Sequence, residues 1–211
     1  MIFHCIRHGE SEFNAQGRIQ GQADIPLSDF GRIQSSTLPQ TFAGMSIDAL
    51  FSSPLRRAME TAAPLAEALG LELQTDDRLM EIDAGIFQEL VWSEIVERYP
   101  QEAAHWKSRD PDYRIPGGET RRELMQRGRE AFESLLATGY LETVVVAHGG
   151  LLSAVLKSLL EVPDPLHPFR LYNCSISRVV WNGEDIELRS LNEVAHLHDI
   201  SANAKTHGGD L

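Results

Sequence analysis

The stretch IFHCIRHGESEFN, residues 2–14, decides the fold prediction, because an apolar run there ends abruptly in Arg7-His8-Gly9-Glu10. The first part of the run, residues 2–6, predicts a short buried β-strand. A hydrophobic core does not readily accommodate an arginine, a histidine and a glutamate in close succession. These residues therefore indicate a site at the end of the strand, with partners elsewhere in the chain.

Two further apolar runs are followed by the same kinds of residue. Residues 49–52 predict a second strand, and Arg56 and Arg57 come shortly after it. The β-branched run 143–146 predicts a third strand, after which His148 comes at once. Histidines and arginines thus follow three separate strands.

Helix signals follow these strands. Ser53 and Pro54 predict an N-cap with proline at the first helical position, and the residues after Gly150 predict a helix that Pro163 stops. Three other elements are predicted: a helix from Leu27-Ser28 that Pro39 kinks or ends, a helix over 120–137 capped by Thr120, and a strand hairpin around Asn182-Gly183.

Strands that alternate with helices predict an α/β three-layer sandwich, with a mostly parallel sheet and helices on both faces. In such sheets, ligands bind beyond the carboxyl ends of the strands, at a switch point in strand order. Arg7 and His8, the two arginines at 56 and 57, and His148 should therefore meet at one edge of the sheet.

Length and composition bound the function. The 211 residues predict one domain over 1–198 and a mobile polar tail over 199–211. A net charge of -12 argues against nucleic acid as a partner, and the apolar stretches are too short to cross a membrane. The first residues show no signal pattern, and two cysteines give no disulfide framework, so we expect a cytoplasmic location.

The residue types at this edge suit phosphoryl chemistry. An arginine offers a planar fork of donors to phosphate oxygens, and helix N-termini after Pro54 and Gly150 add backbone donors. One histidine can attack phosphorus while the other donates a hydrogen bond, and surrounding positive charge favours the neutral, nucleophilic imidazole. We also expect Gly9 to let the backbone approach the bound group closely.

The leaving group needs a proton donor, which a carboxyl group can supply. Glu81 in DRLMEIDAG is the leading candidate, and Glu10, Asp83 and Glu119 compete with it. Position in the sequence alone does not decide among these four carboxyl groups.

Five motifs, RHGESEFNAQGRIQGQADIPLSDFG, SSPLRRAMETA, LMEIDAG, PGGET and VVVAHGG, resemble in order and spacing the histidine phosphatase superfamily, also called the phosphoglycerate mutase-like family. The resemblance spans residues 2–191 and implies the fold inferred above, with no metal or other cofactor. It implies these roles: His8 as phosphoryl acceptor, Arg7, Arg57 and His148 as the phosphate pocket, Glu81 as proton donor, and Asn14, Gln20 and Gly149 as substrate contacts.

The chain departs from the family pattern beside the proton donor. Many relatives have glycine-x-tryptophan-glutamate-glycine where this chain has Gly85-Ile86-Phe87-Gln88-Glu89, and Met80 replaces a residue that is often polar or basic. Both differences affect the expected fit of the substrate, and the sequence does not identify that substrate.

Three functions compete. The leading one is a phosphatase that acts on a small phosphorylated metabolite through a phosphohistidine, with a mutase and a non-catalytic phospho-ligand sensor as rivals. The resemblance implies that mutases carry a longer insertion over the site, whereas residues 83–118 predict only a short cap here. Its aromatic residues, such as Trp92 and Trp106, should pack the cap, with one of them as a candidate substrate wall. A homodimer is compatible with all three functions.

Overall fold

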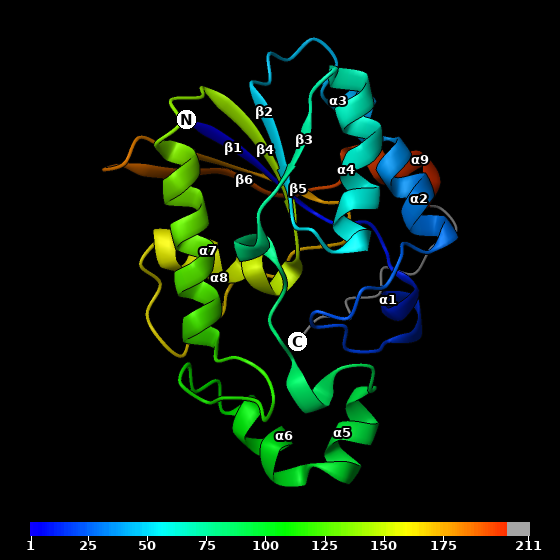
Figure 1. The fold of residues 1–211 in the computed structure, drawn as a ribbon, viewed down its shortest axis with the longest axis vertical. Helices are drawn as coiled ribbons and strands as arrows, with labels where there is room; N and C mark the ends of the chain where they lie inside the picture. Colours follow the sequence, from blue (N-terminus) through cyan, green and yellow to red (C-terminus); the bar gives the residue numbers. More distant parts are fainter. Residues whose placement is uncertain (202–211) are drawn as a thin grey trace.

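The computed structural model describes residues 1–201, which form a sandwich around one six-stranded sheet (Figure 1). The strand order is β3-β2-β4-β1-β5-β6. Strands β3, β2, β4 and β1 run parallel, while β5 is antiparallel to β1 and to β6. The strands are β1 Ile2–Arg7, β2 Ala49–Ser52, β3 Leu73–Thr75, β4 Glu142–Ala147, β5 Ile176–Trp181 and β6 Ile186–Glu193. The predicted mostly parallel sheet and the hairpin at Asn182-Gly183 are confirmed.

The central strands are buried on both faces, as expected for a parallel sheet covered by helices. Alternate residues of β4 enter two different hydrophobic clusters: Val145 packs with Phe3 on one face, and Val144 packs with Ile6 on the other. Their side chains are fully buried. This alternation fixes the register of β1 against β4, because a shift by one residue would exchange the two faces.

Helices cover both faces of the sheet (Figure 1). Helices α7 and α8 lie on one side, and α2, α3, α4 and α9 lie on the other. The helices are α1 Glu12–Gln16, α2 Asp29–Ser36, α3 Leu38–Thr41, α4 Arg56–Leu69, α5 Trp92–Arg98, α6 Pro100–Lys107, α7 Arg121–Leu136, α8 Gly149–Leu159 and α9 His198–Ser201, with short 3-10 turns η1 Asp77–Leu79, η2 Gly85–Phe87 and η3 Ala195–Leu197. The predicted three-layer α/β sandwich is confirmed. Of the predicted tail, residues 199–201 belong to α9, and 202–211 lie outside the described residues.

Most predicted helix starts agree with the structure, and one is wrong. Thr120 caps α7 by accepting a hydrogen bond from the N–H of Glu123, and Ser28 caps α2 in the same way. Helix α2 ends before Pro39, as predicted. The predicted Ser53–Pro54 start of α4 is wrong, because the helix begins at Arg56 with Leu55 as its N-cap.

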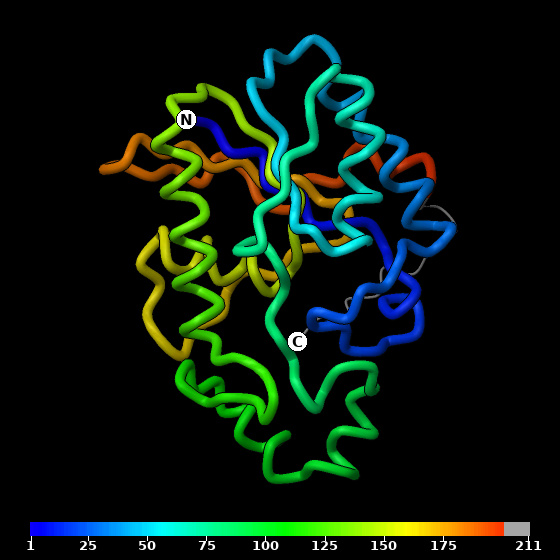
Figure 2. Tube along the Cα trace, in the orientation of Figure 1, coloured from blue at the N-terminus to red at the C-terminus, as the bar shows by residue number. Residues whose placement is uncertain are grey.

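Residues 83–118 form a separate excursion between η1 and α7. In Figure 1, α5 and α6 lie at the bottom of the molecule, and the tube in Figure 2 shows the segment leaving the sheet and returning to α7. Backbone hydrogen bonds join its two ends: the N–H of Glu119 donates to the carbonyl of Asp83, and that of Ile86 to the carbonyl of Pro116. The segment is therefore anchored at its base, next to the loop that carries Glu81.

Candidate functional site

Three adjacent strands, β2, β4 and β1, deliver polar residues to one edge of the sheet. His8 follows β1 and His148 follows β4, and the N–H of His8 donates to the carbonyl of Ala147 at 2.9 Å. The two imidazole rings lie 5.2 Å apart between centroids, with 58° between their planes. The parallel pairing of β1 with β4 thus brings together two histidines that are 140 residues apart in the chain.

A short hydrogen bond sets the tautomer of His8. Its Nδ1 lies 2.6 Å from the carbonyl oxygen of Gly9, which can only accept, so Nδ1 carries the proton. In the neutral ring, Nε2 then holds the lone pair. The amide of Asn173 donates to the carbonyl oxygens of His8 and Gly9 at 3.1 and 3.3 Å. Asn173 is a site residue that the sequence prediction missed, since it lies in a loop before β5 with no motif around it.

Gly9 is needed where the loop after β1 packs closely against α2. A Cβ atom at this position would lie 2.8 Å from the carbonyl oxygen of Gly31, which is too close for any other residue. Its N–H donates to the hydroxyl of Thr61 at 2.9 Å. The glycine therefore lets the loop after β1 pack against α2, and its predicted close approach to a bound group stays a prediction.

His148 is held by Ser53, the residue that was expected to cap a helix. The two are joined by a hydrogen bond of 2.8 Å between Nε2 of His148 and the hydroxyl oxygen of Ser53. Burial, reinforced by the nearby charge of Arg57 and by His8, holds the pKa of His148 well below its ordinary value. The ring is therefore neutral at neutral pH. Its Nδ1 is buried and has no hydrogen-bond partner within residues 1–201.

The two arginines expected in a phosphate pocket are both buried, and carbonyl oxygens orient them. Arg57 donates through Nη1 to Ala23 and through Nη2 to Gly21, each at 2.8 Å. Arg7 donates through Nη1 to the carbonyl of Leu171 at 2.6 Å. Arg56, the alternative in the same motif, points away and pairs with Glu60 at 2.6 Å on the surface. The structure thus places Arg57, and not Arg56, beside the histidines.

Glu81 lies in the loop after η1, and backbone N–H groups surround its buried carboxylate. Oε1 accepts from Ile82 and Leu151, and Oε2 accepts from Gly150, all at 2.9 Å. A Cβ on Gly150 would lie 2.5 Å from Oε1, so this approach requires glycine. Two of the N-terminal donors of α8 that we expected to bind the phosphoryl group, the N–H groups of Gly150 and Leu151, are instead occupied by Glu81.

The three competing carboxyl groups are placed differently. Glu10 accepts a hydrogen bond from the hydroxyl of Ser28 at 2.7 Å, and Asp83 accepts one from the N–H of Gly85 at 3.0 Å. Glu119 pairs with Arg127 at 2.6 Å. None of the three lines the cavity described below, whereas Glu81 does.

Asn14 and Gln20 share one hydroxyl group. The Oγ atom of Ser11 lies 3.1 Å from Oδ1 of Asn14 and 2.6 Å from Oε1 of Gln20. Oδ1 of Asn14 also accepts a hydrogen bond from the amide of Asn173 at 3.1 Å. This bond joins α1 to the loop before β5, whose Asn173 also contacts the His8 carbonyl. All three polar side chains of this group, Ser11, Asn14 and Gln20, are buried.

The departures from the family pattern lie in the network around Glu81. Gln88 accepts a hydrogen bond from the N–H of Gln22 at 2.7 Å, and the Gln22 amide donates to the carbonyl of Glu81 at 3.1 Å. The carbonyl of Met80 accepts from Arg127 at 2.6 Å, and Phe87 is fully buried. These residues shape the loops on either side of the proton-donor candidate.

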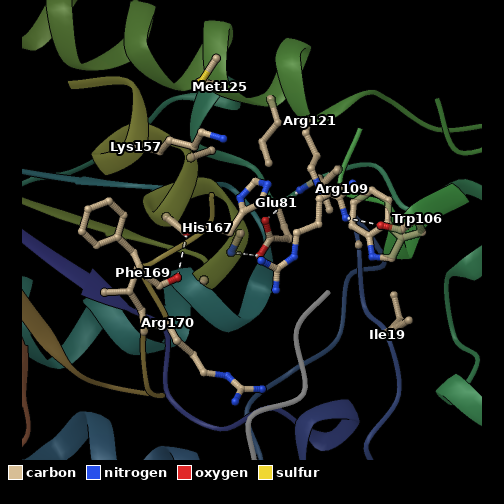
Figure 3. A pocket seen from close by; sticks show the side chains of 18 of the residues that line it. Ile19, Glu81, Trp106, Arg109, Arg121, Met125, Lys157, His167, Phe169 and Arg170 are labelled. Atoms are coloured by element: carbon tan, nitrogen blue, oxygen red, sulfur yellow. Dashed lines mark hydrogen bonds between the residues drawn. The ribbon is translucent and has the colours of Figure 1, made fainter. Parts of the chain in front are cut away.

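A cavity of about 790 Å³ opens at this edge (Figure 3). Arg7, Gln20, Glu81 and Gly149 line it, together with Trp92 and Trp106 from the segment 83–118. Within residues 1–201, no group of three His, Cys, Asp or Glu side chains is arranged to hold a metal ion. No helix of the same residues has the length and apolar character needed to cross a membrane.

Comparisons with known proteins agree with this architecture. Residues 3–194 match the sequence profile of the histidine phosphatase superfamily (branch 1). A probable phosphoglycerate mutase of Proteus mirabilis is 36% identical over 94% of this chain and 95% of its own, and a putative phosphoserine phosphatase of Hydrogenobacter thermophilus is 29% identical over 94% and 98%. The solved structure of a mycobacterial glucosyl-3-phosphoglycerate phosphatase superposes with a TM-score of 0.83 at 31% identity, over 92% of this chain and 99% of its own.

Proposed function

The chain belongs to the histidine phosphatase superfamily, and we propose that it is a phosphatase that hydrolyses a small phosphomonoester through a phosphohistidine on His8. The observation that carries this proposal is the 2.6 Å contact between Nδ1 of His8 and the Gly9 carbonyl. It leaves the lone pair on Nε2, beside His148 and two buried arginines.

In the first step, Nε2 of His8 attacks phosphorus and the bond from phosphorus to the ester oxygen breaks. Arg7 and Arg57 offset the negative charge on the remaining phosphoryl oxygens, and the neutral ring of His148 donates a hydrogen bond to one of them. The carbonyl contacts of both arginines fix their forks before the substrate arrives, so little reorganisation accompanies the reaction. In the second step, water attacks the phosphohistidine and releases inorganic phosphate.

Glu81 protonates the leaving alkoxide in this mechanism. Three backbone N–H donors stabilise its ionised form in the free protein. A bound phosphoryl dianion disfavours a second negative charge beside it, which favours the protonated carboxyl group once substrate is bound. The same carboxylate then accepts a proton from the attacking water.

A mutase is the second candidate, since the Proteus mirabilis relative carries that name. The short segment 83–118, with only the helices α5 and α6, favours the phosphatase because it gives water access to the phosphohistidine. The test supplies 3-phosphoglycerate with a trace of 2,3-bisphosphoglycerate and follows the products by phosphorus NMR. We expect inorganic phosphate without 2-phosphoglycerate, and rapid interconversion of the two monophosphates would overturn the phosphatase assignment.

A panel of phosphorylated metabolites, assayed for phosphate release without added metal, identifies the natural substrate.

We also propose a cytoplasmic location, which the two buried free thiols of Cys5 and Cys174 support. The homodimer stays a prediction, and light scattering on the purified protein tests it.

A further inference from the structure

The ring of His148 makes one hydrogen bond within residues 1–201, and its partner is the hydroxyl group of Ser53. Ser53 follows β2 and His148 follows β4, and the parallel pairing of these strands brings both residues to the same edge of the sheet. Both side chains are fully buried. Because the neutral ring carries a single N–H, this hydrogen bond bears on which of the two ring nitrogens holds the proton. The mechanism above assigns no part to Ser53.

The surroundings of the Ser53 oxygen leave its own hydrogen a single acceptor. Oγ accepts a hydrogen bond from the N–H of Leu55 at 3.3 Å and lies 2.8 Å from Nε2 of His148, and residues 1–201 provide it with no third partner. If Nε2 carried the proton, Ser53 would accept twice, and its buried hydrogen would have no acceptor, which is costly. If Nε2 carries the lone pair, the hydroxyl donates to it and accepts from Leu55. The second arrangement satisfies every group at this contact.

A hydroxyl that donates to Nε2 leaves the ring proton of His148 on Nδ1. With Nε2 turned to Ser53, Nδ1 is the nitrogen that remains for a ligand, and it is buried without a hydrogen-bond partner in residues 1–201. The ring of His8 lies beside it, with 5.2 Å between the centroids. The oxygens of a phosphoryl dianion can only accept, so they would be repelled by a lone pair on Nδ1 and bound by an N–H there. A phosphoryl group on the site therefore satisfies this buried donor.

We propose that Ser53 is a positioning residue that sets the tautomer of His148, so that Nδ1 donates to a phosphoryl oxygen of the substrate. The donation to substrate rests on the proposed phosphatase function, whereas the tautomer is a property of the free protein. Both histidines then carry their proton on Nδ1, but they use it differently. The Gly9 carbonyl accepts the proton of His8 and leaves its lone pair for phosphorus, while Ser53 occupies the lone pair of His148 and leaves its proton for oxygen.

Nitrogen-15 NMR of the histidine rings measures the tautomer directly, because protonated and unprotonated ring nitrogens resonate well apart. The signals of His148 are those lost in His148→Ala. At neutral pH, we expect a protonated Nδ1 and an unprotonated Nε2 in the wild-type protein, both free and with inorganic phosphate bound. Ser53→Ala removes the donor to Nε2 and should give a mixture of the two tautomers in the free protein. A wild-type proton on Nε2, or a tautomer that Ser53→Ala leaves unchanged, would overturn the inference.

Kinetics show whether Ser53 acts through His148. In Ser53→Ala, kcat/KM for p-nitrophenyl phosphate should fall roughly tenfold, as for the loss of one neutral hydrogen bond to the reacting group. In a protein that already carries His148→Ala, the same substitution should cause no further fall, because the ring that Ser53 orients is gone. An unchanged kcat/KM in Ser53→Ala, or an equal additional fall in the His148→Ala background, would overturn the positioning role.

The matched control is Ser52→Ala, which removes the same atom from the preceding residue. Ser52 is equally buried, but its hydroxyl donates to the carbonyl oxygen of Ser53 at 2.9 Å and not to a ring. The tautomer of His148 and kcat/KM should stay those of the wild type, and changes equal to those of Ser53→Ala would overturn the inference by assigning both to packing. If the wild-type protein shows no His8-dependent hydrolysis of p-nitrophenyl phosphate, the proposed function fails instead, and NMR of the free protein still tests the tautomer.

Discussion

Arg127 holds the backbone of Glu81: its Nη2 donates to the Glu81 carbonyl oxygen at 2.8 Å. The same guanidinium donates through Nη1 to the carbonyl oxygens of Arg78 and Met80, at 2.8 and 2.6 Å, and pairs with Glu119. Helix α7 therefore fixes the backbone of the loop that carries the proton-donor candidate, while the N-terminus of α8 binds its carboxylate. Arg127 is a positioning residue in this arrangement, since it acts through Glu81.

Arg127→Met should displace that loop. We expect a larger fall in kcat for alkyl phosphates than for aryl phosphates, because only the alkyl leaving group needs the proton. The free energy of unfolding should fall by about 1–3 kcal/mol, since Glu119 loses its partner. The control is Arg129→Met, two residues further along α7, where the arginine pairs with Glu133 and donates to Ser158 but does not contact the Glu81 loop, so the ratio of the rates for the two leaving groups should stay that of the wild type. Equal falls for both leaving groups in Arg127→Met would contradict the positioning role.

Glu81→Gln should slow alkyl phosphates far more than nitrophenyl phosphates, whose leaving group barely needs a proton. The amide also replaces one acceptor oxygen by a donor that faces backbone N–H groups. A loss of stability of about 1–3 kcal/mol should therefore accompany the kinetic effect. Chemical denaturation measures the loss of stability, and steady-state kinetics measure the leaving-group effect. If both substrate types slow equally, another carboxyl group is the acid.

The stability of the protein should fall as the pH is lowered from about 6.5 towards about 4. Burial lowers the pKa of four histidines below that of the unfolded chain: His4, His148, His167 and His196. Below the unfolded pKa, the unfolded chain takes up protons that the folded protein does not, which favours unfolding. Thermal melting across this range measures the effect, and His167→Gln should make the fall smaller. A midpoint that stays constant or rises on acidification would contradict the assignment of these rings as neutral.

The sheet and the pairing of its strand ends could be predicted because they follow from local patterns. Apolar runs such as 143–146 mark buried strands, and the rule for the carboxyl edge of a parallel sheet then brings His8 and His148 together. The meeting of these two histidines at one edge can be predicted without knowing the exact order of the strands. The resemblance to a known family added the choice of Glu81 and Arg57.

Tertiary contacts decided what the sequence left open. Ser53 has the pattern of an N-cap, but its hydroxyl pairs with His148, so the helix starts two residues later than Pro54. The donors of Gly150 and Leu151 bind Glu81, which comes from a loop far away in sequence. The guanidinium of Arg121 stacks on the indole of Trp106, 3.1 Å from the ring centroid, and no local pattern in the sequence indicates this contact.

Trapping the phosphorylated intermediate shows whether His8 accepts the phosphoryl group. The protein is mixed with a radioactively labelled phosphomonoester, stopped in alkali during turnover, digested and mapped. We expect alkali-stable, acid-labile phosphate on the peptide that contains His8, none in His8→Ala, and normal labelling in His105→Ala, whose exposed ring stacks on Tyr113 outside the site. Phosphate retained by the His8→Ala protein, or turnover by that variant at the wild-type rate, would show that His8 is not the phosphoryl acceptor.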